Sequence, residues 1–98
     1  MSDDTQDQLD PVAEAILTVL EAAPDNKAQP KAVAEYLANA RRTKKDPPDL
    51  WRRYMMAVRQ QAKFLARSGV IEILRKGKPV DPHAPIKGLV VLRLTQTD

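Results

Sequence analysis

Five cations and no carboxylate lie between Asp49 and Glu72, on a segment with helical periodicity. At about 100° per residue, its polar side chains fall within an arc of roughly 120° on one side of a helix. These polar residues are Arg52, Arg53, Arg59, Gln60, Lys63 and Arg67. The opposite side has residues spaced to pack against other helices, namely Trp51, Met55, Val58, Ala62 and Leu65. Since solvated helix faces usually mix charges of both signs, this cationic face favours an anionic partner.

Two further groups of cations flank this segment in the chain. The first group, in "RRTKKDPP" at residues 41–48, is Arg41, Arg42, Lys44 and Lys45. The second group, in "RKGKPVDPHAPIKG" at residues 75–88, is Arg75, Lys76, Lys78 and Lys87. If the two loops flank the exposed face of the helix, three cationic segments converge on one surface.

This surface predicts a nucleic-acid interface. Lysine supplies a point charge for phosphate, whereas the guanidinium fork of arginine can also read guanine edges. We expect the loop cations to contact phosphates on either side of the helix. The residues expected to face a major groove are Arg52, Arg59, Gln60 and Lys63.

The aromatic residues are interpreted as packing residues rather than as a base-stacking platform. Trp51 falls on the core side of the predicted helix, and large aromatic side chains dominate small cores. Tyr36, Tyr54 and Phe64 do not form the interleaved aromatic array that is typical of single-strand binders.

Residues suited to catalysis or metal binding are few. His83 is the only histidine, and "DPH" at residues 81–83 offers two metal ligands, fewer than zinc requires. The chain has no cysteine, and its three glycines are too scattered to form a phosphate-binding loop. We therefore predict a protein that is not an enzyme and that has no cofactor and no metal site.

Three predicted helices position the cationic residues. Asp10 can cap a first helix that has Pro11 at its first position and runs to about Ala23. After a predicted turn, "PDNKAQ" at residues 24–29, a second helix runs from Pro30 to about Ala40.

The third helix is expected from about Leu50 to Ser68. Asp46 and Asp49, around two prolines, give it a start signal. Gly69 ends it, since a glycine can adopt the left-handed conformation just past a helix.

Two strands are expected after the third helix. "VIEIL" at residues 70–74 and "LVVLRL" at residues 89–94 are rich in branched aliphatic residues and have strand length. Residues 75–88 join them as the long loop of a hairpin. Three helices followed by a hairpin predict an α+β fold, a winged helix-turn-helix domain over residues 10–98 with this loop as its wing. The loop at residues 41–48 is longer than the ~3 to 4 residues of a tight helix-turn-helix.

Charge is distributed unevenly along the chain. Residues 1–25 contain seven carboxylates and no lysine or arginine, whereas the rest contain all sixteen cations and six acids. This asymmetry suggests a polyanionic partner for the basic part.

Residues 1–9 are polar and acidic, and we predict a disordered tail that either aids solubility or weakly inhibits binding by covering the basic surface. Without a signal peptide or an apolar run of transmembrane length, we expect a soluble cytoplasmic protein that does not enter a membrane.

The segment "WRRYMMAVRQQAKFLARSGVIEILRKGKPVDP" followed by "KGLVVLRL" resembles the small bacterial proteins of domain-of-unknown-function family 3253. "PKAVAEYLA" also resembles the second helix of that family, so the likeness covers about residues 10–95. The resemblance implies a winged-helix fold and no established activity. Where the family usually has Gly-Pro-Ile-Arg, this chain reads "GLVV", so Val91 replaces a cation. The matching positions are Trp51, Arg52, Met55, Val58, Arg59, Leu65, Gly69, Ile71, Lys76, Gly77, Val80, Asp81, Gly88, Leu92, Arg93 and Leu94.

The sequence thus predicts a winged-helix domain that binds duplex DNA through the third helix and the wing. The alternative is a protein-interaction module that uses the same basic face for an acidic protein, and RNA is a third candidate partner. Neither a target sequence nor an oligomeric state is specified by the residues.

Overall fold

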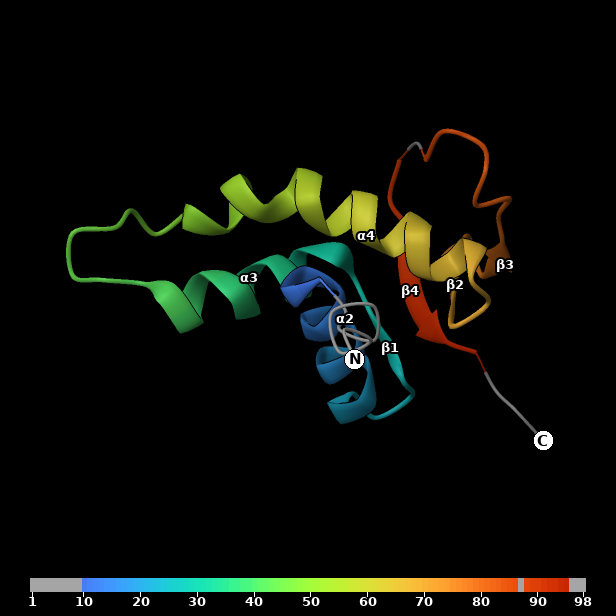
Figure 1. The fold of residues 1–98 in the computed structure, drawn as a ribbon, viewed down its shortest axis with the longest axis horizontal. Helices are drawn as coiled ribbons and strands as arrows, with labels where there is room; N and C mark the ends of the chain where they lie inside the picture. The colour runs from blue at the N-terminus through green and yellow to red at the C-terminus, as the bar shows by residue number, and fades with distance from the viewer. Residues whose placement is uncertain (1–9, 87, 96–98) are drawn as a thin grey trace, which may run out of the picture.

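A computed structural model of the chain describes residues 10–86 and 88–95. Within these residues, three α-helices pack against a four-stranded antiparallel sheet, so the predicted α+β class is confirmed (Figure 1). The predictions for the tail at residues 1–9 and for Lys87 lie outside the described residues. The elements in chain order are α2 (Pro11–Ala22), β1 (Lys27–Ala28), α3 (Pro30–Arg41), the 3-10 helix η1 (Leu50–Tyr54), α4 (Met55–Arg67), β2 (Ile71–Arg75), β3 (Lys78–Pro79) and β4 (Val91–Leu94).

The first two helices begin as the sequence predicts. The Asp10 carboxylate accepts a hydrogen bond from the backbone N–H of Val12 at 2.7 Å, and Pro11 occupies the first turn of α2. Pro30 likewise opens α3, although Gln29 before it makes no side-chain capping bond. Both helices end within one residue of the expected positions. These ends were predictable because proline and hydrophobic periodicity are signals in the local sequence.

The third predicted helix has the expected span but not the expected conformation at its start. Leu50–Tyr54 forms a 3-10 helix that continues into α4. Neither predicted start signal caps it, because Asp46 accepts a bond from the backbone of Thr43 within the loop, at 2.8 Å, and Asp49 makes no side-chain capping bond. A 3-10 helix turns about 120° per residue, so Arg52 and Arg53 are rotated away from the positions that a continuous α-helix would give them.

The end of α4 is confirmed in detail. Gly69 has a φ of 83°, which a residue with a Cβ adopts only with strain. The backbone N–H of Gly69 donates to the carbonyl of Ala66 at 3.1 Å, and that of Val70 donates to Leu65 at 3.0 Å. These two bonds form a Schellman motif, which satisfies carbonyls that the helix end would otherwise leave unpaired.

The sheet has the strand order β1-β4-β2-β3 and contains two strands that the sequence did not predict. Lys27 and Ala28 pair with Arg93 and Leu92 of β4, so part of the predicted turn at residues 24–29 is a strand. A two-residue strand has no periodicity of its own, and only pairing with a distant partner reveals it. The two predicted strands exist with shifted ends, Ile71–Arg75 and Val91–Leu94.

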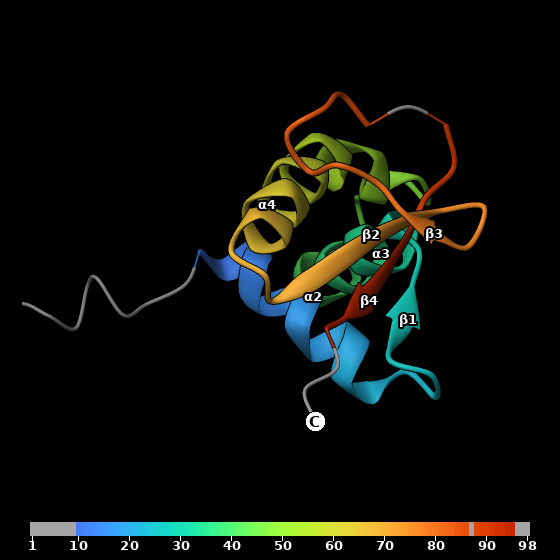
Figure 2. The ribbon, with the colours of Figure 1, turned by 90° about the vertical axis from the view of Figure 1, so that its right-hand side faces the viewer.

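The long hairpin loop expected at residues 75–88 is also partly wrong. Arg75 pairs with Lys78 across a two-residue turn, in which Lys76 and Gly77 have φ values of 54° and 82°. Two successive positive φ values are typical of a type I′ turn, whose twist matches that of the strands it joins. The segment predicted as the wing, which keeps that name below, therefore consists of a tight β2–β3 hairpin followed by a return segment, residues 80–86 and 88–90, that leads to β4 (Figure 2).

The core lies between the three helices and one face of the sheet (Figure 2). Ile71 and Ile73 on β2 are buried, whereas Glu72 between them is only partly buried, as expected for a strand with one covered face. On the outer face, Glu72 accepts hydrogen bonds from the guanidinium of its cross-strand partner Arg93. The largest fully buried side chains are Ile16, Leu20, Val33, Val58, Leu65, Ile71, Ile73 and Leu92.

Candidate nucleic-acid interface

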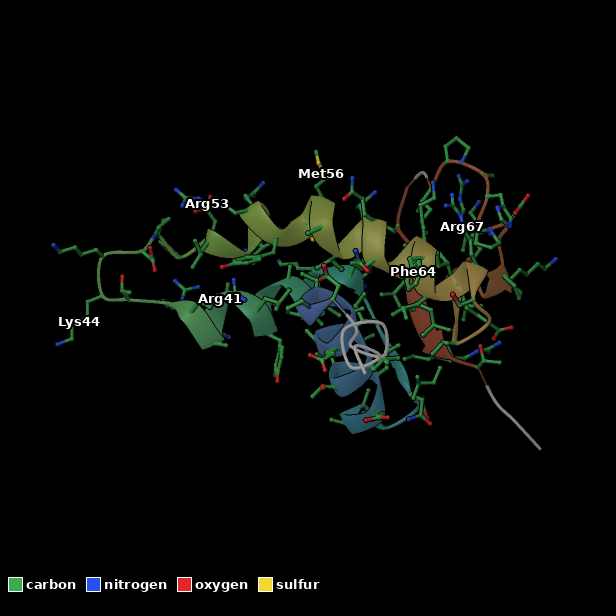
Figure 3. All side chains as sticks on the ribbon, viewed as in Figure 1. Arg41, Lys44, Arg53, Met56, Phe64 and Arg67 are labelled. Carbon is green, nitrogen blue, oxygen red and sulfur yellow. The ribbon has the colours of Figure 1, made fainter. Side chains whose placement is uncertain are left out.

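The solvent side of η1 and α4 forms the candidate interface (Figure 3). Val58, Ala62 and Leu65 on its other side are buried, so the predicted division between core and solvent sides is correct for these three residues. Arg53 and Gln60 are exposed, and Arg59 and Lys63 are partly buried. Among the described residues, none of these four side chains has a hydrogen-bond or ion-pair partner, which leaves their polar groups available to a ligand.

The exposed face of α4, predicted to be cationic, also carries large apolar side chains. Met56 is 73% exposed and Phe64 is 52% exposed, so large apolar groups lie among the cations. A packing role is predicted for Phe64 from the sequence, yet its helical angle places it at the edge of the exposed arc, and this angle could have revealed its exposure. Tyr36 on α3, for which packing is also predicted, is 45% exposed.

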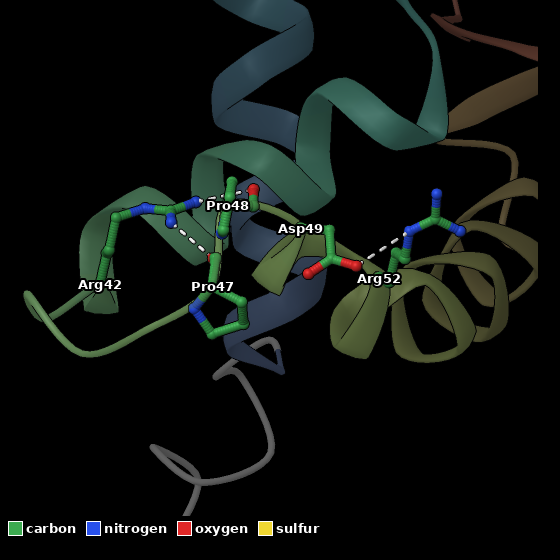
Figure 4. A network of polar contacts seen from close by, with 5 residues as sticks. All are labelled: Arg42, Pro47, Pro48, Asp49 and Arg52. Carbon is green, nitrogen blue, oxygen red and sulfur yellow. Dashed lines mark hydrogen bonds and ion pairs between the residues drawn. The ribbon is translucent and has the colours of Figure 1, made fainter.

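Several predicted site arginines already have partners within the molecule. Arg42 donates from its guanidinium to the carbonyl of Pro47 at 2.7 Å and to that of Pro48 at 3.4 Å, which braces the loop before η1 (Figure 4). The Nε of Arg52 lies 3.4 Å from the Asp49 carboxylate. Because these contacts are exposed to solvent, both arginines can exchange them for a ligand at small cost.

Arg67 at the end of α4 and Arg75 on β2 lie beside the return segment of the wing. Arg67 donates from Nε to the carbonyl of Pro82 at 3.2 Å, which ties the return segment of the wing to the end of α4. The guanidinium of Arg75 lies beside Gly88, where an added Cβ would be 3.9 Å from its Nε. The Arg67 hydrogen bond holds the return segment close to the end of α4.

Trp51 lies at the edge of the core rather than inside it. It packs against the core, as the sequence predicts, but it is only partly buried. The Nζ of Lys31 on α3 lies 4.6 Å from the centroid of the indole, and the Cζ of Arg52 lies 5.0 Å from it. No signal in the sequence indicates the Lys31 contact, which depends on how α3 packs beside η1. Together with Met55, Arg59 and Val90, Trp51 and Lys31 line a small and mainly apolar cavity of about 210 Å³.

The cationic loops lie at opposite ends of the η1–α4 helix. The loop that contains Lys44 and Lys45 joins α3, whose last residue is Arg41, to η1 at one end, and the wing lies beside the other end (Figures 1 and 3). At about 2.0 Å per residue for 3-10 helix and 1.5 Å for α-helix, the two ends are roughly 30 Å apart. The wing cations Lys76 and Lys78 are exposed. The three cationic segments therefore lie in line along the helix and do not form one compact cluster.

The described residues contain no group of three or more His, Cys, Asp or Glu side chains that could hold a metal ion. His83 lies in the wing, where its backbone N–H donates to the carboxylate of Asp81 at 2.8 Å. No helix in the part of the chain that the structure describes is long and apolar enough to cross a membrane.

Comparison with protein families confirms the resemblance inferred from the sequence. A family model described as "Protein of unknown function (DUF3253)" matches residues 9–95. No curated protein matches the chain. The matched residues contain every element of the fold and every residue of the candidate interface.

Proposed function

The chain belongs to the DUF3253 family, whose description names no activity, and from its own surface we propose that it is a winged-helix protein that binds duplex DNA. The order of elements supports a winged helix. The short strand β1 follows the first helix, two further helices follow β1, and a hairpin with an extended return segment closes the domain. In such domains the last helix enters the major groove, and flanking segments contact the DNA backbone.

The observation that carries this proposal is the charge of the η1–α4 helix. Residues 50–71 contain five cations and no carboxylate, and the only carboxylate paired with one of them in the described residues is Asp49 before the helix. An unbalanced positive surface attracts phosphate, and release of the counterions around DNA makes such binding favourable.

The arrangement of the loops suits a duplex. The two ends of the η1–α4 helix are separated by roughly 30 Å, close to one turn of B-DNA at about 34 Å. Lys44 and Lys45 at one end and Lys76 and Lys78 at the other can then contact phosphates about one turn apart. Between them, the exposed Gln60 is the side chain best placed to reach base edges.

The histidine and the carboxylate beside it also support a binding role rather than catalysis. The only histidine lies on the wing, and the carboxylate nearest to it in sequence is occupied by a backbone N–H. General acid–base or nucleophilic chemistry needs a pair of such groups held within hydrogen-bond reach of a substrate. We therefore propose a protein that is not an enzyme and that needs no cofactor.

Fluorescence anisotropy with labelled random-sequence duplex DNA, duplex RNA and single-stranded DNA, each at several salt concentrations, tests the proposal. We expect the tightest binding to duplex DNA, with an affinity that falls as salt rises. Stronger binding to RNA of equal length would favour RNA as the partner. No binding to any of the three at low salt would refute nucleic-acid binding.

Met56 and Phe64 support one alternative, in which the basic face binds an acidic protein. Exposed apolar residues surrounded by charged ones are typical of protein interfaces. The two proposals differ in the size of their salt dependence, since neutralising DNA phosphates releases condensed counterions, whereas a protein interface in which Met56 and Phe64 are buried draws part of its affinity from apolar area.

A further inference from the structure

The exposed side of α4 has a stripe of three uncharged side chains, two of them apolar, in addition to its cations. Met56, Gln60 and Phe64 follow one another at intervals of four residues, and all three are exposed. Residues four apart lie on one side of a helix, separated by about 6 Å along its axis and about 40° around it. Figure 3 shows Met56 pointing away from the body of the protein. Burying Met56 and Phe64 in a complex would therefore be favourable.

The cations beside this stripe restrict the partner. Arg53 precedes Met56 by one turn, and Lys63 is adjacent to Phe64, so an apolar group in contact with the stripe must be flanked by negative charge. The major groove of DNA meets this condition, because the C5-methyl groups of thymine project into a groove about 12 Å wide between two phosphate backbones. An interval of about 6 Å corresponds to roughly two base-pair steps of about 3.4 Å.

Resting on the proposed function, we infer that Met56 and Phe64 read the methyl groups of thymine, and that Gln60 between them reads adenine. Apolar side chains contact the thymine methyl, and glutamine can pair with both N6 and N7 of adenine. The protein therefore prefers A·T-rich duplexes through the major groove. The cations supply affinity that does not depend on sequence, and the stripe supplies the preference.

Uracil offers a direct test, because it differs from thymine only by the absence of the C5-methyl group. A random-sequence duplex pool is enriched for binding over several rounds and then copied with either dTTP or dUTP. The two pools have identical sequences and identical phosphate charge. We expect the protein to bind the thymine pool more tightly by about fourfold for each methyl group buried, the effect of burying one CH₂-sized group. If Met56 and Phe64 each bury one methyl group, the affinity for the thymine pool should exceed that for the uracil pool by roughly fifteenfold.

The variant Met56→Ser/Phe64→Ser should bind the two pools equally and retain the salt dependence of the wild type. Tyr36→Ser is the matched control, because Tyr36 is 45% exposed, close to the 52% of Phe64, but lies on α3. It should leave the preference for thymine unchanged. Thermal unfolding of each variant checks that the fold is retained.

The outcomes separate this inference from the proposed function. Equal affinity of the wild type for the thymine and uracil pools would overturn methyl recognition while leaving DNA binding intact. A preference for thymine that survives in Met56→Ser/Phe64→Ser would also overturn it, since the methyl groups would then be read elsewhere. Failure to bind either pool at low salt would refute the proposed function itself.

Discussion

Removing charge from the α4 surface should change how DNA affinity depends on salt. Arg53 and Lys63 are suitable targets, because neither has a hydrogen-bond or ion-pair partner among the described residues. Arg59 is less suitable because it lines the cavity beside Trp51, and its removal would also alter packing. Glutamine preserves most of the side-chain stem at both positions, so Arg53→Gln/Lys63→Gln removes charge with little effect on the fold.

The size of the effect follows from the number of phosphates that the variant no longer neutralises. Each neutralised phosphate contributes about 0.9 to the slope of log affinity against log salt, so the double variant should lower its magnitude by up to about 1.8. Between 50 and 200 mM salt, a fourfold increase, the affinity advantage of the wild type should therefore shrink by about twelvefold. Anisotropy titrations of one labelled duplex at four or five salt concentrations measure this directly.

Lys27→Gln provides the control for net charge. Lys27 is exposed on β1 and pairs with Arg93, so it belongs to the outer side of the sheet and not to the α4 surface. Its removal should leave the slope nearly unchanged. If the Arg53→Gln/Lys63→Gln slope equals that of the wild type, the phosphate-binding residues lie elsewhere. A decrease for Lys27→Gln of about half that size, equal for each charge removed, would mean that net charge, and not this surface, attracts DNA.

Three further predictions concern the fold and the acidic segment. Gly69→Ala should lower the free energy of unfolding by about 1 to 2 kcal/mol in urea denaturation, because an added Cβ meets no atom within 4 Å and only the positive φ opposes it; an unchanged stability would contradict the role of the Schellman motif. Trp51→Ala should lower the free energy of unfolding by about 3 kcal/mol in urea denaturation monitored by circular dichroism. This is the low end for large aromatic residues, because Trp51 is only partly buried. A stable variant that no longer binds DNA would instead indicate that Trp51 contacts the ligand. Deleting residues 1–9, which include three aspartates, should tighten DNA binding at low salt and have little effect at high salt if they compete with phosphate; equal affinities across the salt range would exclude self-inhibition.

Helix positions and the major strands were predictable because their signals are local. The capping aspartate Asp10, the first-turn proline Pro30 and the terminal Gly69 act within one turn of the residues they affect. The aliphatic runs at β2 and β4 likewise indicate strands without knowledge of their partners. The α+β class and the cationic character of the α4 surface followed from these signals alone.

The tertiary structure decided the features that depend on residues far apart in the chain. Lys27 and Ala28 form a strand only because β4 lies beside them, and Lys31 contacts Trp51 only because α3 packs along η1. Burial also depends on neighbouring elements, and Phe64 remains exposed because no part of the described structure covers that side of α4. Short-range preferences therefore determined where the helices form, whereas the packing of distant segments decided which of their side chains a ligand can reach.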